Sequence, residues 1–466
     1  MSHKRTARSR VVTLAVGALV AAALAGPSGA YAGQSAEDPT NGGDWDQVDP
    51  PPYGDAPDQP HNTGSATPCT WLVKGRLYVQ APTLDGIADH EPLAGVEIKV
   101  SGADSVGSAA NVFGKWGTTH TDANGEFSLS HDECHDRRVR VEARFSSADG
   151  DLRVLGPASP EWYVLKDTND VGDVATIDLK GEPFGGETGD QATSQARTDA
   201  QTWIFYRKAI DYLASIKSPM LNDLTVHNPA STAPNGSWTD PVLHGIHIDP
   251  QFTNDPWNLA HELGHAEAYP REDGEDCLTW ALSDGSTHDF EEKPCVAFNE
   301  GFGDFFASKL LTEMGDAGLI TLPGYHYETK PYTRSHLVKK GLDDVYSAEH
   351  NELGWDQAFR VLTSSDVTSR LFGDGEGKDG KYVGDYAGSC AGVGAPTGKD
   401  DLADAIRVIG DASDQFGLQN GQNPSFFLFF ERAVDRLGGF DPADSDRYQQ
   451  IVAPTSDVEP HELYGC

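Results

Sequence analysis

The chain has 466 residues, enough for more than one domain with its own hydrophobic core. Its 72 acidic and 35 basic residues give a formal net charge of −37. This charge argues against nucleic acid and anionic membranes as partners, because the attraction that drives such binding becomes repulsion. Acidic clusters can also hold Ca²⁺, so calcium is a possible second cofactor that composition alone does not locate.

Residues 1–32 have the organisation of a secretory signal peptide. Four basic residues within positions 4–10 precede an apolar stretch at 11–25, and Ala30-Tyr31-Ala32 forms a small-x-small cleavage site. The alternative is a membrane anchor, but the apolar stretch is short for a bilayer span. We therefore expect a secreted, extracellular protein, cleaved near Ala32 and not attached to a membrane afterwards.

The next segment, residues 33–67, is rich in Gly, Pro, Asp and Asn and is predicted to be a disordered linker. Residues 68–181 change to alternating apolar positions typical of strands. Three sets show this alternation: Val96, Ile98 and Val100; Val139, Val141, Ala143 and Phe145; Ala175, Ile177 and Leu179. The pattern predicts a small antiparallel β-sandwich.

Asn124-Gly125 is a strong hairpin-turn signal between two strand-forming runs. Asp122, Asn124 and Glu126 could alternatively form a calcium loop, although a turn fits the pattern better. The passage from VKGRLYV through PLAGVEIKVSG to TDANGEFSL resembles the carboxypeptidase-regulatory-like, or transthyretin-like, module of secreted hydrolases. This resemblance implies an accessory role in docking, substrate binding or stabilisation.

A Gly-rich linker, residues 182–190, precedes the predicted catalytic domain at 191–466. The domain opens with a long helical pattern, whose apolar residues are Trp203, Tyr206, Ile210 and Leu213. Alternation over residues 242–248 then predicts a strand at a sheet edge, with His244 and His247 as candidates for lining a cleft. The alternative is that both histidines are simply exposed polar residues.

The segment DPWNLAHELGHAEAYP, residues 255–270, has the signals of a short helix with an Asp cap, a first-turn Pro and a terminating Pro. His261 and His265 are four residues apart and therefore point from one face. They would supply two of the three protein ligands that a catalytic zinc needs. Glu262 could then act as general base on a water activated by the metal. The alternative is a helix with two surface histidines.

The sequence HELGH resembles the zincin metallopeptidases. It departs from the metzincin branch, which would need Gly and His where this chain has Ala268 and Arg271. Asn299-Glu300-x-x-x-Asp304 resembles the pattern of the gluzincin, or thermolysin-like, clan. This resemblance implies that Glu300 is the third zinc ligand and that Asp304 accepts the second N–H of a ligating histidine.

Glu300 follows His265 by 35 residues, which is more than thermolysin-like enzymes usually show. The additional length includes Gly285-Ser286-Thr287-His288-Asp289, loosely similar to the segment through which aspzincins supply an aspartate ligand. Asp289 or His288 is therefore the alternative third ligand.

Zincin peptidases of this type also stabilise the oxyanion with a His or Tyr donor. By resemblance, His350 is the candidate because it stands just before a helix predicted from about Trp355, and Tyr346 is a second candidate. The alternative for His350 is a solvated loop side chain. Residues 372–400 are Gly- and Asp-rich and are predicted to form a surface loop, since their acidic residues do not match the EF-hand spacing.

The six cysteines suggest three disulfides in an exported protein. Six cysteines allow fifteen connectivities. The predicted domain layout favours Cys69–Cys134, Cys277–Cys295 and Cys390–Cys466, because each bond then closes within one region.

Taken together, the sequence predicts a multidomain protein, with an N-terminal antiparallel β-sandwich followed by an α+β zincin-like catalytic domain whose C-terminal part is mainly helical. The expected function is secreted, zinc-dependent hydrolysis of peptide bonds in a protein or peptide substrate. Two alternatives stay open: a catalytically silent binding or adhesion protein on the same scaffold, and a zinc esterase or amidase. Cleavage specificity, endopeptidase against exopeptidase action and oligomeric state are not predicted.

Overall fold

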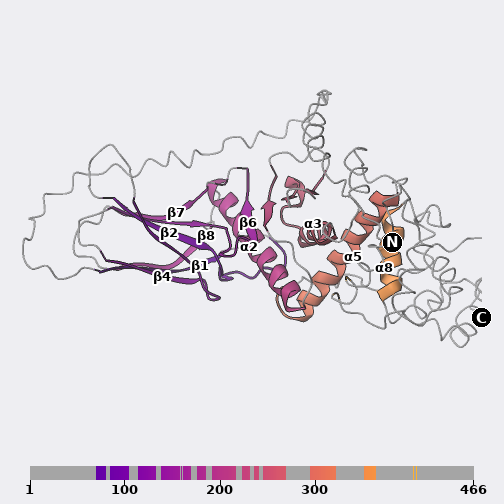
Figure 1. Cartoon of the computed structure of the whole chain (residues 1–466), viewed down its shortest axis with the longest axis horizontal. Coiled ribbons are helices and arrows are strands. Elements are labelled where there is room, and N and C mark those ends of the chain that lie inside the picture. The colour runs from indigo at the N-terminus through magenta and orange to yellow at the C-terminus, as the bar shows by residue number, and fades with distance from the viewer. Residues whose placement is uncertain are drawn as a thin grey trace, which may run out of the picture. The chain divides into compact units, whose positions relative to one another are not determined.

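The structure is a computed structural model of the chain. It describes residues 70–79, 84–103, 114–132, 138–157, 159, 161–168, 176–184, 191–216, 223–230, 236–240, 245–268, 294–321, 351–363, 402 and 406. These residues form β-sheets and helices in a mixed α/β arrangement (Figure 1). None of the helices among them has the length and apolarity needed to cross a bilayer.

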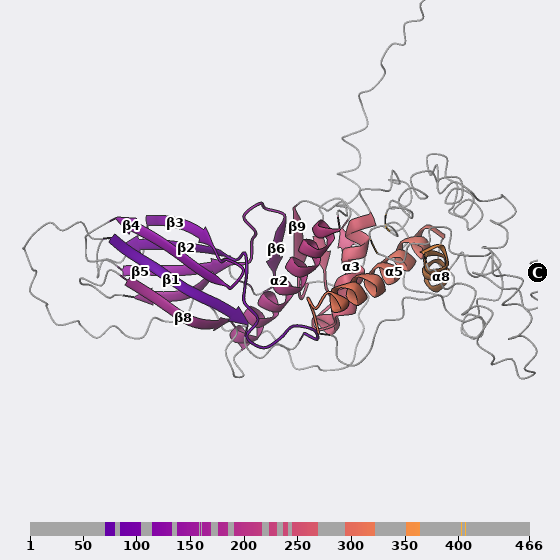
Figure 2. The same ribbon diagram turned by 90° about the horizontal axis from the view of Figure 1, so that it is seen from below.

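Two sheets share one apolar core in the range predicted to form the sandwich (Figures 1 and 2). One sheet has the strand order β3-β2-β5-β7 and the other the order β4-β1-β8. Their strands are β1 (Thr70–Val79), β2 (Glu97–Ala103), β3 (Gly114–His120), β4 (Glu126–Asp132), β5 (Arg138–Arg144), β7 (Tyr163–Thr168) and β8 (Thr176–Phe184). The alternating residues of the first two predicted runs, around Ile98 and Val141, are buried as expected.

Two details of this pair of sheets differ from the predictions. Strand β1 pairs with β8 in parallel, so the sheets are not purely antiparallel. Strand β8 also continues to Phe184, into the range predicted to be a linker, because residues 182–184 pair with 77–79 of β1.

The turn at Asn124-Gly125 is confirmed, but it does not join a hairpin. The Asp122 carboxylate accepts hydrogen bonds from the backbone N–H groups of Asn124 and Glu126, and Gly125 has a φ of +73°. However, β3 pairs with β2 and β4 pairs with β1, so the turn carries the chain from one sheet to the other. Oδ1 of Asp122 therefore binds the backbone of a turn, as expected of the preferred alternative.

A third sheet has the strand order β10-β11-β9-β6, built from β6 (Leu152–Leu155), β9 (Leu224–His227), β10 (Trp238–Asp240) and β11 (Gly245–His247). Strand β6 belongs to the range predicted for the sandwich, yet it pairs in parallel with β9 from the range predicted for the catalytic domain. The two ranges therefore share a sheet.

The sheet edge near the site is also assigned differently from the prediction. Residues 245–247 form β11, which lies between β9 and β10, so β10 is the terminal strand of this sheet among the described residues. The His247 ring stacks between the rings of His227 and Trp238. His247 is therefore part of an aromatic row across three strands, while His244 lies outside the described residues.

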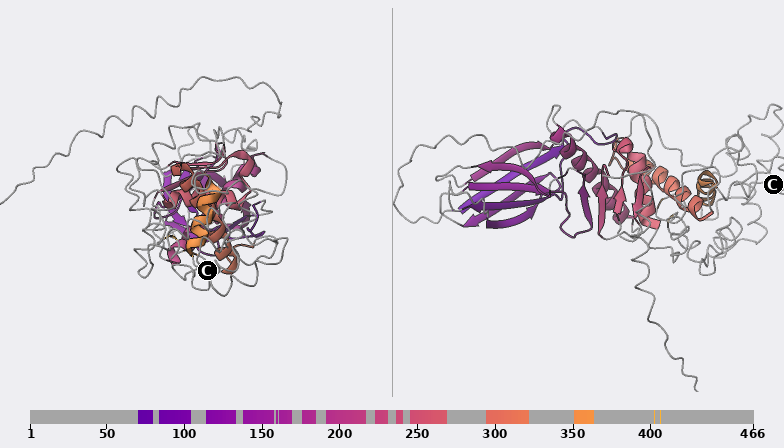
Figure 3. Two further views of the ribbon diagram at one scale, coloured as in Figure 1. Left: turned by 90° about the vertical axis from the view of Figure 1, so that its right-hand side faces the viewer. Right: turned by 90° about the horizontal axis from the view of Figure 1, so that it is seen from above.

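The helices that carry the site are α2 (Gln191–Ser215), α3 (Pro256–Ala268), α5 (Pro294–Asp316) and α8 (Glu352–Thr363). Helix α2 buries all four apolar residues of its predicted pattern, and the Tyr206 hydroxyl donates to the Leu259 carbonyl of α3. The Asp255 carboxylate accepts the Trp257 N–H, which confirms the predicted cap of α3. Helices α3, α5 and α8 pack in series, α3 against α5 and α5 against α8 (Figures 1 and 3).

A buried carboxylate joins α2 to the end of the sandwich sheets. Asp199 accepts hydrogen bonds from the side chains of Ser159, Tyr163 and Gln195. Burial raises the pKa of Asp199 to about 6, and the three hydrogen bonds partly oppose this effect.

This raised pKa predicts how stability depends on pH. Below about pH 4 the carboxyl is protonated in both the folded and unfolded states, so its burial costs nothing. Between about pH 4 and pH 6 the carboxyl ionises in the unfolded state but stays protonated in the folded state. The unfolding free energy therefore falls as pH rises to the folded pKa, by up to about 3 kcal/mol for a pKa difference of two units. We expect the unfolding free energy of the wild type, minus that of Asp199→Asn, to fall by this amount between pH 4 and 7. Urea unfolding of both proteins measures the difference, and a difference that does not change with pH would contradict it.

Candidate metal centre

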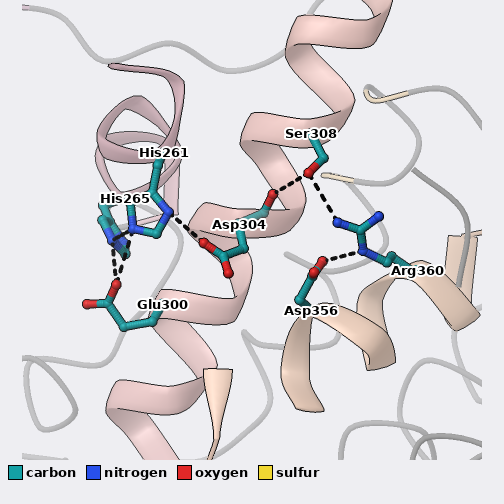
Figure 4. A network of polar contacts seen from close by, with 7 residues as sticks. All are labelled: His261, His265, Glu300, Asp304, Ser308, Asp356 and Arg360. Carbon is teal, nitrogen blue, oxygen red and sulfur yellow. Dashed lines mark hydrogen bonds and ion pairs between the residues drawn. The ribbon is translucent and has the colours of Figure 1, made fainter. Parts of the chain in front are cut away.

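Three side chains from two helices meet at one point. His261 and His265 project from one face of α3, and Glu300 projects from α5 (Figure 4). Their donor atoms lie within 4.8 Å of one another, and the two histidines are buried. Glu300 keeps 23% of its side chain exposed, so the group is open to solvent on the Glu300 side. This is a group that could hold a metal ion, and it is the one such group found among the described residues.

The distances between the donor atoms fit a tetrahedral ion. His261 Nε2 lies 3.0 Å from His265 Nε2 and 3.2 Å from Glu300 Oε2, and His265 Nε2 lies 3.4 Å from Glu300 Oε2. Ligands bound to tetrahedral zinc at about 2.0–2.1 Å are about 3.3–3.4 Å apart. Two imidazoles and one carboxylate are also a donor set that zinc accepts in catalytic sites. The residues therefore fit this metal in chemistry and in spacing.

Asp304 lies behind His261, one helical turn after Glu300. Its Oδ1 is 2.9 Å from His261 Nδ1 (Figure 4). A proton on Nδ1 would face this carboxylate, which leaves the Nε2 lone pair directed toward Glu300 and His265. A contact of this kind fixes the tautomer and the ring orientation of a metal-ligating histidine.

The electrostatics of the group favour a cation. Burial alone would lower the pKa of His261, but the hydrogen bonds and charges of Asp304 and Glu300 outweigh it and hold this pKa well above its usual range. Burial alone would likewise raise the pKa of Glu300, but the neighbouring histidines hold it well below its usual range. Two carboxylates thus face one buried imidazole, and the arrangement binds a proton or another cation tightly.

Glu262 belongs to α3 with the two histidines, and the charges of all three donor residues act on its carboxyl. It is 3% exposed, and its Oε2 accepts a hydrogen bond of 2.7 Å from the Thr239 hydroxyl of β10. Burial raises the pKa of this carboxyl, while the charges of His265 and His261 and the Thr239 hydroxyl oppose the shift. A carboxylate whose pKa is raised by burial is suited to accept a proton near neutral pH.

Helix α8 supports α5 through a buried polar chain. Arg360 donates to Asp356 Oδ1 at 2.6 Å and to Ser308 Oγ at 3.1 Å, and the Ser308 hydroxyl donates to the Asp304 carbonyl at 3.0 Å (Figure 4). Burial raises the pKa of Asp304, His261 opposes this shift, and the nearby acidic groups Asp356 and Glu352 add to it. Arg360 supplies positive charge next to Asp356, and so limits the repulsion that Asp304 experiences.

Close helix packing depends on three glycines. A Cβ atom at Gly303 of α5 would lie 2.8 Å from His261 Cε1 and 2.9 Å from His261 Nδ1. A Cβ atom at Gly264 of α3 would lie 3.0 Å from the Phe306 Cβ atom, and one at Gly301 would collide with the backbone of α8. The His261 imidazole therefore lies against α5 at a point where only a hydrogen fits.

We expect Gly303→Ala to weaken zinc binding about 10- to 100-fold, which is typical for changes that disturb the support of a ligating histidine. The added methyl group must displace the His261 ring or separate α3 from α5. Gly301→Ala is the matched control, because it also places a methyl group on α5 but clashes with α8 instead of His261.

The measurement is zinc affinity by competition with a chromophoric chelator, together with thermal unfolding. Gly301→Ala is expected to lower the unfolding temperature more than the zinc affinity. Equal zinc affinities for Gly303→Ala and the wild type would show that the ring does not need this space.

Of the predicted site residues, His261, Glu262, His265, Glu300 and Asp304 are brought together. The other candidates, His350, Tyr346, His288 and Asp289, lie outside the described residues, as does the predicted loop at 372–400. At least one cysteine of each predicted disulfide also lies outside them. Four further residues belong to the site and were not predicted from the sequence: Thr239, Gly303, Asp356 and Arg360. Gly303 could have been predicted, because a glycine inside the helical pattern that carries Glu300 and Asp304 indicates that another group approaches the helix closely there.

Comparisons with known proteins add little to this geometry. No family model matches the chain, and no curated protein sequence matches it. Among solved structures, the chain is similar to a 9R-lipoxygenase from Cyanothece PCC8801, with 17% sequence identity and a TM-score of 0.15. The match covers 34% of this chain and 27% of the lipoxygenase chain. A likeness with so low a TM-score carries no argument about fold or function.

Proposed function

We propose that the chain is a secreted zinc-dependent peptidase of the gluzincin, or thermolysin-like, type, which acts on a protein or peptide substrate. One observation carries the proposal: the zinc-compatible spacing of His261, His265 and Glu300, with Glu262 beside them. The Asp304 contact to His261 supports the same assignment, because the HELGH and N-E-x-x-x-D motifs each supply the part that the resemblance implies. The β-sandwich remains an accessory module in this proposal.

His261, His265 and Glu300 would hold the metal, and Asp304 would hold His261 in the required tautomer. When bound, zinc would supply Lewis-acid chemistry: it would polarise the scissile carbonyl and lower the pKa of water, so that a nucleophilic hydroxide can form near neutral pH. Glu262 takes the proton of that water and later passes it to the leaving amine. Strand β10, the terminal strand of its sheet among the described residues, contacts α3, and an extended substrate would pair with its outer side.

A protein-substrate assay with and without a chelator tests the proposal. Casein hydrolysis should be lost with 1,10-phenanthroline and restored by stoichiometric Zn²⁺, and metal analysis should find about one zinc per chain. Hydrolysis of simple esters or amides without any casein cleavage would favour the esterase or amidase alternative. Zinc binding without hydrolysis of either would favour a silent binding protein. In an exporting host, N-terminal sequencing of the mature protein should begin at Gly33.

A further inference from the structure

A threonine from the sheet edge holds the carboxylate of Glu262. Thr239 lies at the centre of β10 and is 6% exposed. Its Oγ1 is 2.7 Å from Glu262 Oε2 and 2.9 Å from the Glu262 backbone carbonyl oxygen. Within the described part of the chain, no other side chain donates a hydrogen bond to this carboxylate.

The two contacts fix different parts of the same residue. A hydroxyl has one proton, which the Glu262 backbone oxygen and Oε2 share. The hydroxyl reaches both acceptors only while both hold their present positions. The bond to the backbone oxygen fixes Thr239 relative to α3, and the bond to Oε2 then selects the direction of the Glu262 side chain. The Thr239 contact occupies Oε2 and not Oε1, so in the proposed mechanism Oε1 would accept the proton.

A second strand-to-helix bond provides an internal comparison. Two residues before Thr239, the Ser237 hydroxyl bonds to Asn258 Oδ1 at 2.6 Å, one helical turn before Glu262. Ser237 directly precedes β10, and its hydroxyl and that of Thr239 both bond to α3, so both attach this part of the chain to the helix. Only the Thr239 bond ends on the carboxylate beside the metal ligands.

We propose that Thr239 is a positioning residue for the general base, acting through its hydroxyl on the orientation of the Glu262 carboxylate. This inference rests on the proposed peptidase function. It predicts that the hydroxyl matters for the proton transfer step, whereas the volume of the side chain and the general attachment of β10 do not.

The test compares Thr239→Val, which keeps the shape and removes the hydroxyl, with Thr239→Ser, which keeps the hydroxyl. We expect Thr239→Val to lower kcat about 10- to 100-fold with little change in KM, because it removes a hydrogen bond to a charged catalytic group. Thr239→Ser should stay within about threefold of the wild type in kcat. Ser237→Ala, the matched control, should keep the wild-type kcat, and zinc content should be the same in all variants.

An equilibrium measurement avoids dependence on turnover. A peptide hydroxamic acid that binds zinc as its anion must give its proton to a nearby base. Its affinity, measured by calorimetry, should fall in Thr239→Val and be retained in Thr239→Ser. If Thr239→Val does not fold, Thr239→Ala provides the hydroxyl-free comparison, with thermal unfolding as the check.

The inference is overturned if Thr239→Val keeps the wild-type kcat, if Thr239→Ser does not restore it, or if Ser237→Ala loses as much. If the proposed function itself is wrong, Glu262→Gln remains active. That result is distinguishable from the three outcomes that overturn the role of Thr239. A further comparison uses the Glu262→Gln background, where Thr239→Val should cause no additional loss. An additional loss there would show that Thr239 acts by another route.

Discussion

Replacing Glu262 by Gln is expected to abolish nearly all peptide hydrolysis while leaving the metal bound. The amide has the size of the carboxylate but cannot take a proton from water, and a positioned acid–base group typically contributes about 10²- to 10⁴-fold in rate. We therefore expect kcat to fall by about 10²- to 10⁴-fold. The donors of His261, His265 and Glu300 are unchanged, so zinc content should stay at one per chain.

Folding should also survive this substitution. Glu262 is 3% exposed, and burial raises its pKa, which means that the ionised form is disfavoured in the folded protein. A neutral amide avoids that cost. Glu267→Gln is the matched control, because Glu267 belongs to the same helix and is equally buried. It is expected to retain activity. Undiminished hydrolysis in Glu262→Gln, with zinc still bound, would remove the proposed mechanism.

The local part of this site was accessible from the sequence. Helical periodicity alone places His261 and His265 on one face, and Asp255 with Pro256 marks where the helix begins. Glu300 and Asp304 came from a motif, and the close approach of Glu300 to both histidines agrees with it. These assignments depend on short-range geometry, which the order of residues determines directly.

The remaining features depend on long-range pairing, which single-chain periodicity does not encode. Asn124-Gly125 correctly predicted a turn, but whether β3 and β4 then pair depends on which partners β1 and β2 offer. In the same way, nothing local indicates that β6 should leave the sandwich sheets and pair with β9. Thr239 was missed for this reason, since its role exists only because β10 lies against α3.

Residues of the site that are distant in sequence lie close together because α3 packs against α5. His265 and Glu300 are 35 residues apart in the chain, yet their donor atoms lie 3.4 Å apart. The small residues Gly264 and Gly303 allow α3 and α5 to approach closely, since a Cβ atom at either would crowd Phe306 or His261 of the other helix. The candidate metal ligands therefore do not depend on the length of the intervening segment, provided that the two helices can dock.

Glu300 is the residue whose replacement should affect the metal most. Glu300→Ala removes one of three protein donors and also leaves two buried imidazoles without their shared carboxylate. We expect zinc affinity to fall by more than the 10- to 100-fold typical of a supporting residue, to about 10³-fold or beyond. Asp304→Ala should stay within that lower range, because it removes only the contact to His261 Nδ1. Chelator competition measures both affinities on one scale.

The order of these effects decides which residue completes the site. If Glu300 is the third ligand, the loss in affinity should follow the order Glu300→Ala, Asp304→Ala, Asp289→Ala, with the last close to the wild type. If Asp289 is the ligand instead, Asp289→Ala should cause the largest loss and Glu300→Ala a small one. That result would favour the aspzincin alternative and would make the 3.2 Å approach of Glu300 to His261 a contact between side chains with no metal-binding role for Glu300. The two histidines and Glu262 keep their roles under either outcome, so this series tests the third ligand separately from the catalytic base.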